Sequence, residues 1–281
     1  MLWDRFHFLC RKCNQLLQSG MPVVDAINTA ESYNACDLYG EQLKPGSVPY
    51  TLITSLRLLI DPQKATKITE IYGRLDFSSI LREPPRLQIL TLYLTFISLV
   101  FALLCSLYQI MIIPQFLSLF ETFNISPPSH IIWYSNYWYL LLLIVMFMLG
   151  IAFAVGIHLK RLFKLSLPTN KLFYRILIPK RIRDVYLNII DIINYPLADK
   201  MEPYGHNNSL ITRTLSEAEK SGSDLSIEIQ VLLRRQGENL SQLSEHYIQS
   251  IIVATSILII VSIFLFLSSA YAPIFVIGEV I

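Results

Sequence analysis

The stretch that decides the fold is Ile132–Ile157, IWYSNYWYLLLLIVMFMLGIAFAVGI, which contains no Asp, Glu, Lys or Arg. Two further stretches, Ile89–Ile113 and Ile251–Tyr271, also lack these four residues. A helix needs roughly 20 apolar residues to cross the ~30 Å hydrocarbon core of a bilayer, and each stretch is long enough. The alternative is a buried helix of a soluble core, but apolar runs of this length favour membrane spans. The sequence therefore predicts three transmembrane helices.

The basic residues predict which side of the membrane each segment faces. Every Lys and Arg lies within Arg5–Arg86 or Lys160–Arg235, and none lies between the first two spans or after the third. Positively charged flanks of spans stay on the cytoplasmic side. We therefore expect the N-terminus and both water-soluble segments to be cytoplasmic. The net charge of +2 is too small to indicate a nucleic-acid partner, so we expect the basic residues to contact an anionic lipid bilayer.

These observations predict an all-α integral membrane protein with two small cytoplasmic helical bundles. Pro114 and Pro273 are expected to end spans one and three at the outer surface, because proline removes a backbone donor. The expected segments are a first bundle (1–86), span one (87–113), an external loop (114–131), span two (132–158), a second bundle (159–247), span three (248–272) and an external tail (273–281).

Gly and Pro residues mark the expected helix ends in the water-soluble segments. Ser19-Gly20 predicts the end of a first helix, with Gly20 in the left-handed C-cap conformation. Pro22 is expected at the start of the next helix, where its missing N–H does no harm. Asp61-Pro62 predicts an N-cap followed by Pro at the first helical position. Gly73 and Gly222 are interpreted in the same way, as residues that set the geometry of helical hairpins.

The second half of the chain repeats signals of the first half in the same order, which indicates an internal duplication. The repeated unit would be a cytoplasmic bundle, a span and an external Pro-x-Phe, with span two as the connector between copies. The matched pairs are Gly20-Met-Pro22-Val-Val-Asp25 with Asn194-Tyr-Pro196-Leu-Ala-Asp199, Glu70-Ile-Tyr-Gly73 with Glu219-Lys-Ser-Gly222, and Pro114-Gln-Phe116 with Pro273-Ile-Phe275.

At these positions the chain resembles the type II secretion system F-domain family, the inner-membrane platform proteins of type IV pilus and type II secretion machines. That family's Ser/Ala-Gly-x-Pro-Leu pattern is similar to Leu16-Leu-Gln-Ser-Gly20-Met-Pro22. Its Gly-Glu-x-x-Gly-x-Leu pattern is similar to Glu70–Leu75 and to Ala218–Leu225. The chain departs from these patterns at Ala218, where the family has Gly, and at Asn194-Tyr-Pro196, where it has Gly-x-Pro.

The resemblance implies a non-catalytic platform in a bacterial inner membrane. Its implied partners are a cytoplasmic assembly ATPase, pilin or pseudopilin subunits, other inner-membrane assembly proteins and further copies of itself as a homo-oligomer. No cofactor is expected, and the sequence contains no Gly-x-x-x-x-Gly-Lys-Ser/Thr loop of its own. The partner-contact or structural candidates are Gly20, Pro22, Glu70, Gly73, Pro114, Pro196, Glu219, Gly222 and Pro273.

Other function classes have weaker support in the sequence. A small transporter or channel subunit remains the alternative, although the predicted spans carry no ionisable Asp, Glu, Lys or Arg. An enzyme is not expected, because the five His residues are scattered and no catalytic motif is present. Cys10 and Cys13 have zinc-ligand spacing without a second pair, so we interpret them as small apolar positions. The acidic group Glu217, Glu219, Asp224 and Glu228 is interpreted as a solvated face.

Overall fold

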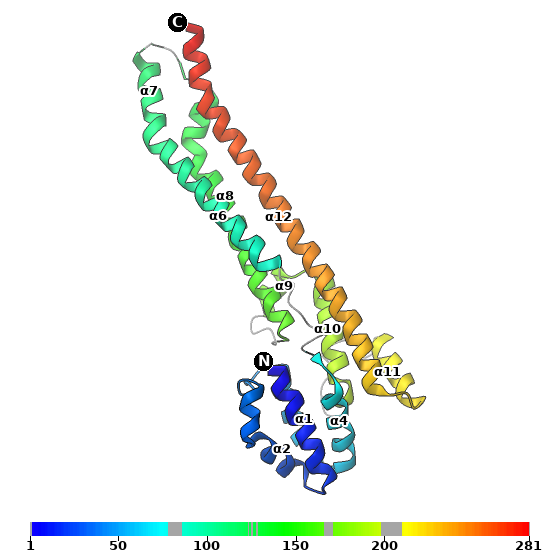
Figure 1. Ribbon diagram of the computed structural model, residues 1–281. Helices are drawn as coiled ribbons and strands as arrows, with labels where there is room; N and C mark the ends of the chain where they lie inside the picture. Colours follow the sequence, from blue (N-terminus) through cyan, green and yellow to red (C-terminus); the bar gives the residue numbers. More distant parts are fainter. Residues whose placement is uncertain are drawn as a thin grey trace. The chain divides into compact units, whose positions relative to one another are not determined.

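The computed structural model describes residues 2–77, 86–122, 124, 126–127, 129–165, 171–197 and 210–280. In these ranges the chain is helical and contains no strand, as the sequence predicted (Figure 1). The chain forms two compact units, of which unit 1 comprises Met1–Pro84 and His158–Ser244 and unit 2 comprises Pro85–Ile157 and Glu245–Ile281. The two water-soluble segments, expected as separate bundles, therefore form one unit.

Unit 1 consists mainly of short helices. Its N-terminal segment contains α1 (Leu2–Gln18), α2 (Val23–Glu31), the 3-10 helix η1 (Asn34–Tyr39), α3 (Val48–Arg57) and α4 (Pro62–Arg74). Its later segment contains α9 (Lys171–Leu177), α10 (Lys180–Asn194), the 3-10 helix η3 (Tyr195–Leu197), α11 (Leu210–Lys220) and the beginning of α12 (Leu225–Val280). The most extensive packing between helices of unit 1 is that of α1 against α4 (Figure 1).

The turn between α1 and α2 follows the predicted glycine. Gly20 has a φ of 88°, the left-handed conformation that costs glycine little. Its N–H donates to the Leu17 carbonyl at 3.0 Å, and the Met21 N–H donates to the Leu16 carbonyl at 3.2 Å. These two bonds form a Schellman motif, which satisfies carbonyls that the helix end leaves free. Pro22 is the N-cap of α2, one residue before the predicted position.

The turn between α11 and α12 uses the same motif. Gly222 has a φ of 74°, and its N–H donates to the Glu219 carbonyl at 3.3 Å. The Ser223 N–H donates to the Ala218 carbonyl at 3.1 Å, which completes a second Schellman motif. Gly20 and Gly222 therefore end their helices in the same way.

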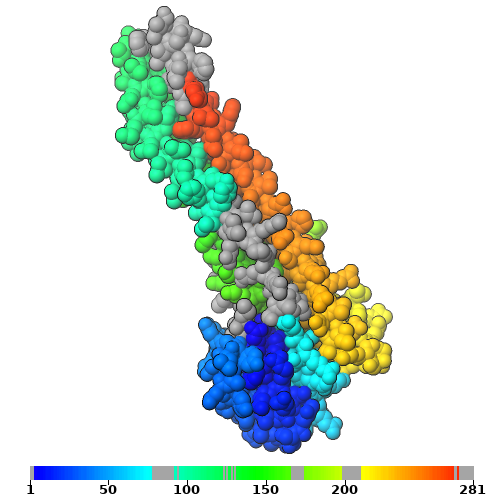
Figure 2. Space-filling model, viewed as in Figure 1, coloured from blue at the N-terminus to red at the C-terminus, as the bar shows by residue number. Residues whose placement is uncertain are grey.

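The core of unit 1 joins the two segments of the sequence. Phe6, Leu52, Tyr72 and Phe77 are fully buried, and the N-terminal segment that carries them is the closely packed blue-to-cyan part of Figure 2. The Tyr72 hydroxyl donates a buried hydrogen bond to the Ile193 carbonyl of α10 at 2.7 Å. That carbonyl is one of the last four of its helix, which have no donor within the helix. The Tyr72 side chain thus caps α10 from the other segment.

Unit 2 contains α6 (Arg86–Leu107), the π-helix η2 (Tyr108–Ile112), α7 (Ile113–Thr122), most of α8 (Ser129–Phe163) and the later part of α12. The described residues include three helical stretches long and apolar enough to cross a membrane: Thr95–Thr122, Ile131–Phe163 and Leu225–Ser268. Only 28%, 11% and 17% of their most apolar windows are buried within the structure. Exposed apolar surface on this scale requires an apolar environment, which agrees with the predicted spans.

Both prolines expected to end spans lie inside continuous helices. Pro114 lies in α7, within the predicted external loop, and the helix continues to Thr122. The preceding turn is π-helical, and in it the Ile113 N–H donates to the Tyr108 carbonyl. This wider turn makes room for the Pro114 ring, which in a regular α-helix would clash with the carbonyl of residue i−4. Pro273 lies in α12, which continues through the predicted tail to Val280. A proline removes only one donor, so a long helix can continue through it when the other backbone bonds persist.

Polar and aromatic side chains join η2 to α8 and α12 in unit 2. The Gln109 side-chain amide donates to the Ser135 carbonyl at 3.2 Å. The rings of Tyr108, Tyr134 and Phe266 pack together, with the Tyr108 and Phe266 centroids 4.9 Å apart in an edge-to-face arrangement. Hydrogen bonds and close packing are the forces that hold helices together where the surroundings are apolar.

Candidate functional site

The two Glu-x-x-Gly motifs lie on two parts of unit 1 that contact each other. One part is α4, and the other is the turn from α11 to α12. Glu70 lies on α4, and Glu219 lies at the end of α11. Ion pairs and hydrogen bonds connect the two sides. We call this group of side chains the α4 seam; it comprises Lys67, Glu70, Arg74, Tyr195, Glu219, Asp224 and Ser226.

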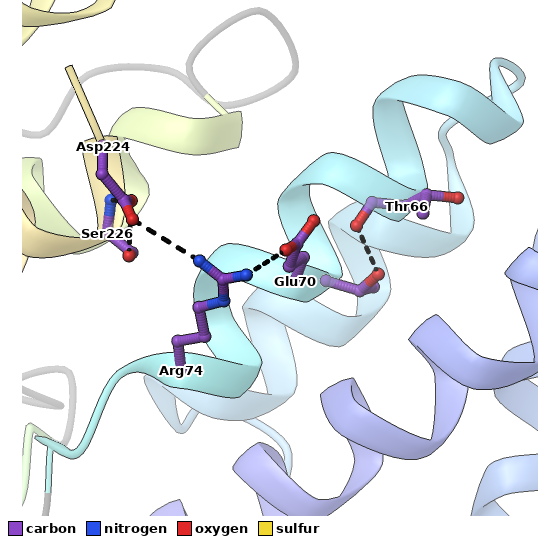
Figure 3. A network of polar contacts seen from close by, with 6 residues as sticks. Thr66, Glu70, Arg74, Asp224 and Ser226 are labelled. Atoms are coloured by element: carbon purple, nitrogen blue, oxygen red, sulfur yellow. Dashed lines mark hydrogen bonds and ion pairs between the residues drawn. The ribbon is translucent and has the colours of Figure 1, made fainter.

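Arg74 forms the centre of one half of the α4 seam (Figure 3). Its guanidinium pairs with Glu70 one turn earlier on α4, and it also reaches Asp224 across the seam at 3.5 Å. Asp224 precedes the first turn of α12 and accepts hydrogen bonds from the Ser226 N–H at 3.0 Å and the Ser226 hydroxyl at 2.7 Å. One carboxylate therefore caps the start of α12 and holds a cation from the N-terminal segment.

These contacts keep Asp224 ionised. The hydrogen bonds from the Ser226 hydroxyl and from the Ser226 N–H lower the pKa of the Asp224 carboxyl, and the nearby Arg74 charge lowers it further. A negative charge at this position also interacts favourably with the positive end of the α12 dipole. Protonation of Asp224 would weaken both the cap and the contact with Arg74.

The other half of the α4 seam centres on Glu219. The Lys67 ammonium lies 3.3 Å from one carboxylate oxygen, and the Tyr195 hydroxyl donates to the other at 3.2 Å. Burial and the adjacent Glu219 charge raise the pKa of Tyr195 to about 12, so its hydroxyl stays protonated and can donate. Pro196, a predicted candidate, follows Tyr195 in η3.

Gly73 lies where α4 packs closely against α1. It is the penultimate residue of α4 and keeps a right-handed helical conformation, which differs from the left-handed one of Gly222. A Cβ added at this position would lie 3.0 Å from the Cγ of Arg11 on α1. The absence of a side chain thus allows α1 and α4 to pack closely. α4 continues through Gly73 to Arg74, and its C-cap is the extended Leu75, so Gly73 does not provide a left-handed C-cap.

The α4 seam is exposed and weakly held. The side chains of Arg74 and Asp224 are 58% and 44% exposed, and those of Lys67 and Glu219 are 64% and 48% exposed. Exposed ion pairs each contribute only about 0 to 1 kcal/mol, because water and salt screen them. The buried Tyr72–Ile193 hydrogen bond is a firmer link between the same two segments. The buried Tyr72–Ile193 bond can therefore keep the two segments together while the exposed ion pairs of the α4 seam break and re-form at low cost in free energy.

Gly20 and Pro22 lie away from the seam, on an open groove in the N-terminal segment of unit 1. The groove has a volume of about 730 Å³ and lies between the α1–α2 turn and the α3–α4 turn. Leu58 and Ile60 line it and are 61% and 91% exposed. Exposed aliphatic side chains beside a groove are typical of a surface that binds another protein.

Sequence reasoning missed His7, which connects α1 to the end of α4. Its ring is buried, stacks on Phe77 at 5.0 Å between centroids, and has Nδ1 2.8 Å from the Tyr72 carbonyl. The Phe77 N–H donates to Nε2 at 3.3 Å. A carbonyl can only accept, so Nδ1 carries the proton and the ring is neutral. One feature of the sequence could have predicted that His7 is buried: it lies between Phe6 and Phe8 on the apolar face of α1.

Burial lowers the pKa of His7, and the nearby Arg11 lowers it further. The hydrogen bond to the Tyr72 carbonyl and the carboxylates of Asp76 and Asp4 raise it, but burial has the larger effect. Protonation at Nε2 would remove the acceptor for the Phe77 N–H and place a charge in the core. The link between α1 and the end of α4 is therefore sensitive to acid.

The cysteines and the acidic group behave as structural features. Cys10 and Cys13 are buried on α1, and burial raises the pKa of the Cys13 thiol to about 11, so it stays protonated. Among the residues that the structure describes, no three His, Cys, Asp or Glu side chains cluster as a metal site would require. In the acidic group, Glu217 pairs with Arg213 at 3.1 Å, and Glu219 and Asp224 have the cationic partners described above.

Comparison of the chain with protein-family models, curated proteins and solved structures finds no match. The class of protein is defined by the structure. It is an all-α protein with three helices long and apolar enough to span a membrane.

Proposed function

We propose that this protein is the membrane platform of a type IV pilus or type II secretion machine. Both water-soluble segments face the cytoplasm of a bacterial inner membrane, where an assembly ATPase acts on unit 1. The spanning helices guide pilin or pseudopilin subunits from the bilayer into the growing filament. The platform is non-catalytic and uses no cofactor. The family motifs of the sequence and the three apolar helices support this role.

The α4 seam carries the proposal. The two copies of the Glu-x-x-Gly motif contribute Glu70 and Glu219 to its two sides, and α12 begins at the seam. A single helix then runs without a break from Leu225 to Val280, through the third apolar stretch. A force on α4 would act on Asp224 through Arg74 and so on the first turn of α12. Weak exposed ion pairs suit a contact that must rearrange repeatedly.

The first experiment tests the partner. The solubilised protein should co-purify with its cognate assembly ATPase, and deletion of its gene should abolish filaments or secretion. Normal filaments in the deletion strain would refute the proposal. The alternative function, a small transporter or channel subunit, predicts the opposite pattern, with solute uptake by reconstituted vesicles and no filament defect.

A second experiment tests the orientation that the proposal requires. Reporter proteins fused after Ser126 should behave as external, and those fused after Asn207 should behave as internal. The reverse result would place unit 1 on the side without ATP, which is incompatible with an ATPase partner.

A further inference from the structure

The segment from Lys160 to Arg183 is the most basic part of the chain. It contains eight of the protein's 23 Lys and Arg residues and no Asp or Glu. The first acid that follows is Asp184. The eight residues are Lys160, Arg161, Lys164, Lys171, Arg175, Lys180, Arg181 and Arg183.

The segment begins on the same helix as the second apolar stretch. α8 is helical from Ser129 to Phe163, and Ile157 is the last residue of the span predicted from sequence. Lys164 follows Ile157 by about two helical turns, or roughly 10 Å along the axis. Where α8 crosses a bilayer, the basic residues at its end therefore lie at the depth of the lipid headgroups.

Many of the basic side chains in this segment are solvent-exposed. Those that the structure describes as exposed are Lys160, Arg161, Lys164, Arg175, Lys180 and Arg181. Asp184 is exposed too, and it is the single acid close to them in sequence. Buried Ile178 and Ile182 fix the beginning of α10 to unit 1, so the charges are held on a folded surface.

An apolar side chain projects from the same surface. Ile176 is 72% exposed, next to Arg175 on α9. A short helix that exposes an aliphatic residue among cations is typical of segments that lie in the membrane interface, with the apolar side chain at the headgroup boundary and the cations at the phosphates.

Two buried donors in this region have no hydrogen-bond partner among the residues that the structure describes. They are the Tyr174 hydroxyl and the Arg183 Nε. The Arg183 charge is close enough to Tyr174 to act on its hydroxyl, and burial raises the pKa of Tyr174 to about 12, so the hydroxyl remains a donor. Both atoms are buried, so they lie beneath the exposed cations and are not part of the exposed surface.

We propose that the exposed cations at the end of α8 and those on α9 and the beginning of α10 form a binding surface for the headgroups of anionic phospholipids, with Ile176 of α9 inserted at the headgroup boundary. These cations are Lys160, Arg161, Lys164, Arg175, Lys180 and Arg181. The occupant is the bilayer surface itself, because the segment adjoins an apolar helix, combines exposed cations with an exposed aliphatic residue and contains no acid. The inference rests on α8 crossing a bilayer and is independent of the proposed platform function.

The test uses the full-length protein in nanodiscs of phosphatidylcholine alone and of phosphatidylcholine mixed with phosphatidylglycerol. The variant Ile176→Cys carries an environment-sensitive fluorophore, and the four natural cysteines are buried, so the parent protein should take up little label. We expect a blue-shifted emission and less quenching by aqueous iodide in the anionic discs, with the difference lost at high salt. Equal emission in the two lipids would overturn the proposal.

Two variants show whether these particular charges are responsible. In the labelled background, Lys164, Arg175, Lys180 and Arg181 are changed to Gln; in the matched control, Lys44, Arg213, Lys220 and Arg235 are changed to Gln. Each cation removed from an anionic surface should shift the equilibrium towards the undocked state by about fivefold. The first variant should lose the anionic-lipid effect and the control should keep it. An equal loss in both would indicate only net charge and would overturn the proposal.

A third arm separates lipid from free anion. Inorganic phosphate is added to the labelled protein in phosphatidylcholine discs, where it should leave the emission unchanged. If phosphate reproduced the blue shift, the segment would be a site for a soluble anion and the lipid proposal would be wrong. The salt and phosphate arms use the variant Ile176→Cys alone, so they remain informative if the fourfold variant fails to fold.

Discussion

Replacement of Tyr72 by Phe should destabilise unit 1 by about 1 to 3 kcal/mol, the cost of leaving a buried carbonyl without a donor. The substitution keeps the ring, which is fully buried, and removes only the hydroxyl that donates to the Ile193 carbonyl at 2.7 Å. No cavity larger than one oxygen atom is created, so the loss reports the hydrogen bond. Since this bond joins the two segments of unit 1, its loss should weaken the whole unit.

The assay is urea unfolding in detergent, followed by the fluorescence of Trp3. This residue packs on Phe77 in the core of unit 1 at 4.5 Å between ring centroids. The other two tryptophans, Trp133 and Trp138, are replaced by Phe in all proteins compared, so that the signal comes from unit 1. Tyr50→Phe is the matched control, because Tyr50 is 41% exposed and its change should cost less than about 0.5 kcal/mol. Equal midpoints for Tyr72→Phe and the parent would refute the role assigned to this bond.

Three further predictions concern single side chains. Because the pKa of His7 is lowered on folding, the folded state binds this proton more weakly than the unfolded state. Stability from His7 should thus be complete above about pH 6.5 and should fall below it by up to ~1.4 kcal/mol per pH unit until the folded pKa is reached. His7→Gln should remove this part of the pH dependence in urea unfolding at several pH values, and an unchanged profile would contradict it. Gly20→Ala should cost about 1 kcal/mol in the same assay, from its φ of 88° alone, because nothing lies within 4 Å of an added Cβ; a neutral effect would show that the turn has relaxed. Gln109→Leu should weaken the η2–α8 contact by roughly 0.6 to 2 kcal/mol, measured as a lower thermal midpoint in detergent, and an unchanged midpoint would show that the bond to Ser135 adds nothing.

Features with a local cause could be predicted from the sequence. The left-handed glycine at Gly20 was predicted because a helix end needs a residue that tolerates positive φ. The cap at Asp61 was predicted from the Asp-Pro pair, and its carboxylate accepts the Gln63 N–H at 2.9 Å. The three apolar helices were predicted from length and charge alone, because a bilayer imposes both.

Features that depend on distant residues could not be predicted. Pro114 was expected to end a span at the outer surface, and the π-helical turn before it, through which the helix continues, was not predicted. Gly73 was matched to Gly222 by sequence, although it is glycine for a different reason, the approach of Arg11. His7 and Tyr72 are explained only by partners many residues away, the Phe77 N–H and the Ile193 carbonyl. The Glu70 and Glu219 motifs were found, but not the Arg74 and Lys67 side chains that connect them.

The central claim is that the α4 seam couples unit 1 to filament assembly. The most direct test complements a deletion strain with charge variants of the seam and measures the number of surface filaments or the amount of secreted substrate. Lys67→Glu and Glu219→Lys each place like charges across the seam, and each should reduce assembly severalfold. The double variant restores opposite charges and should recover assembly. The matched double variant Arg213→Glu with Glu217→Lys exchanges a pair within α11 and should assemble normally. Full assembly by both single seam variants, at normal protein levels, would contradict the account.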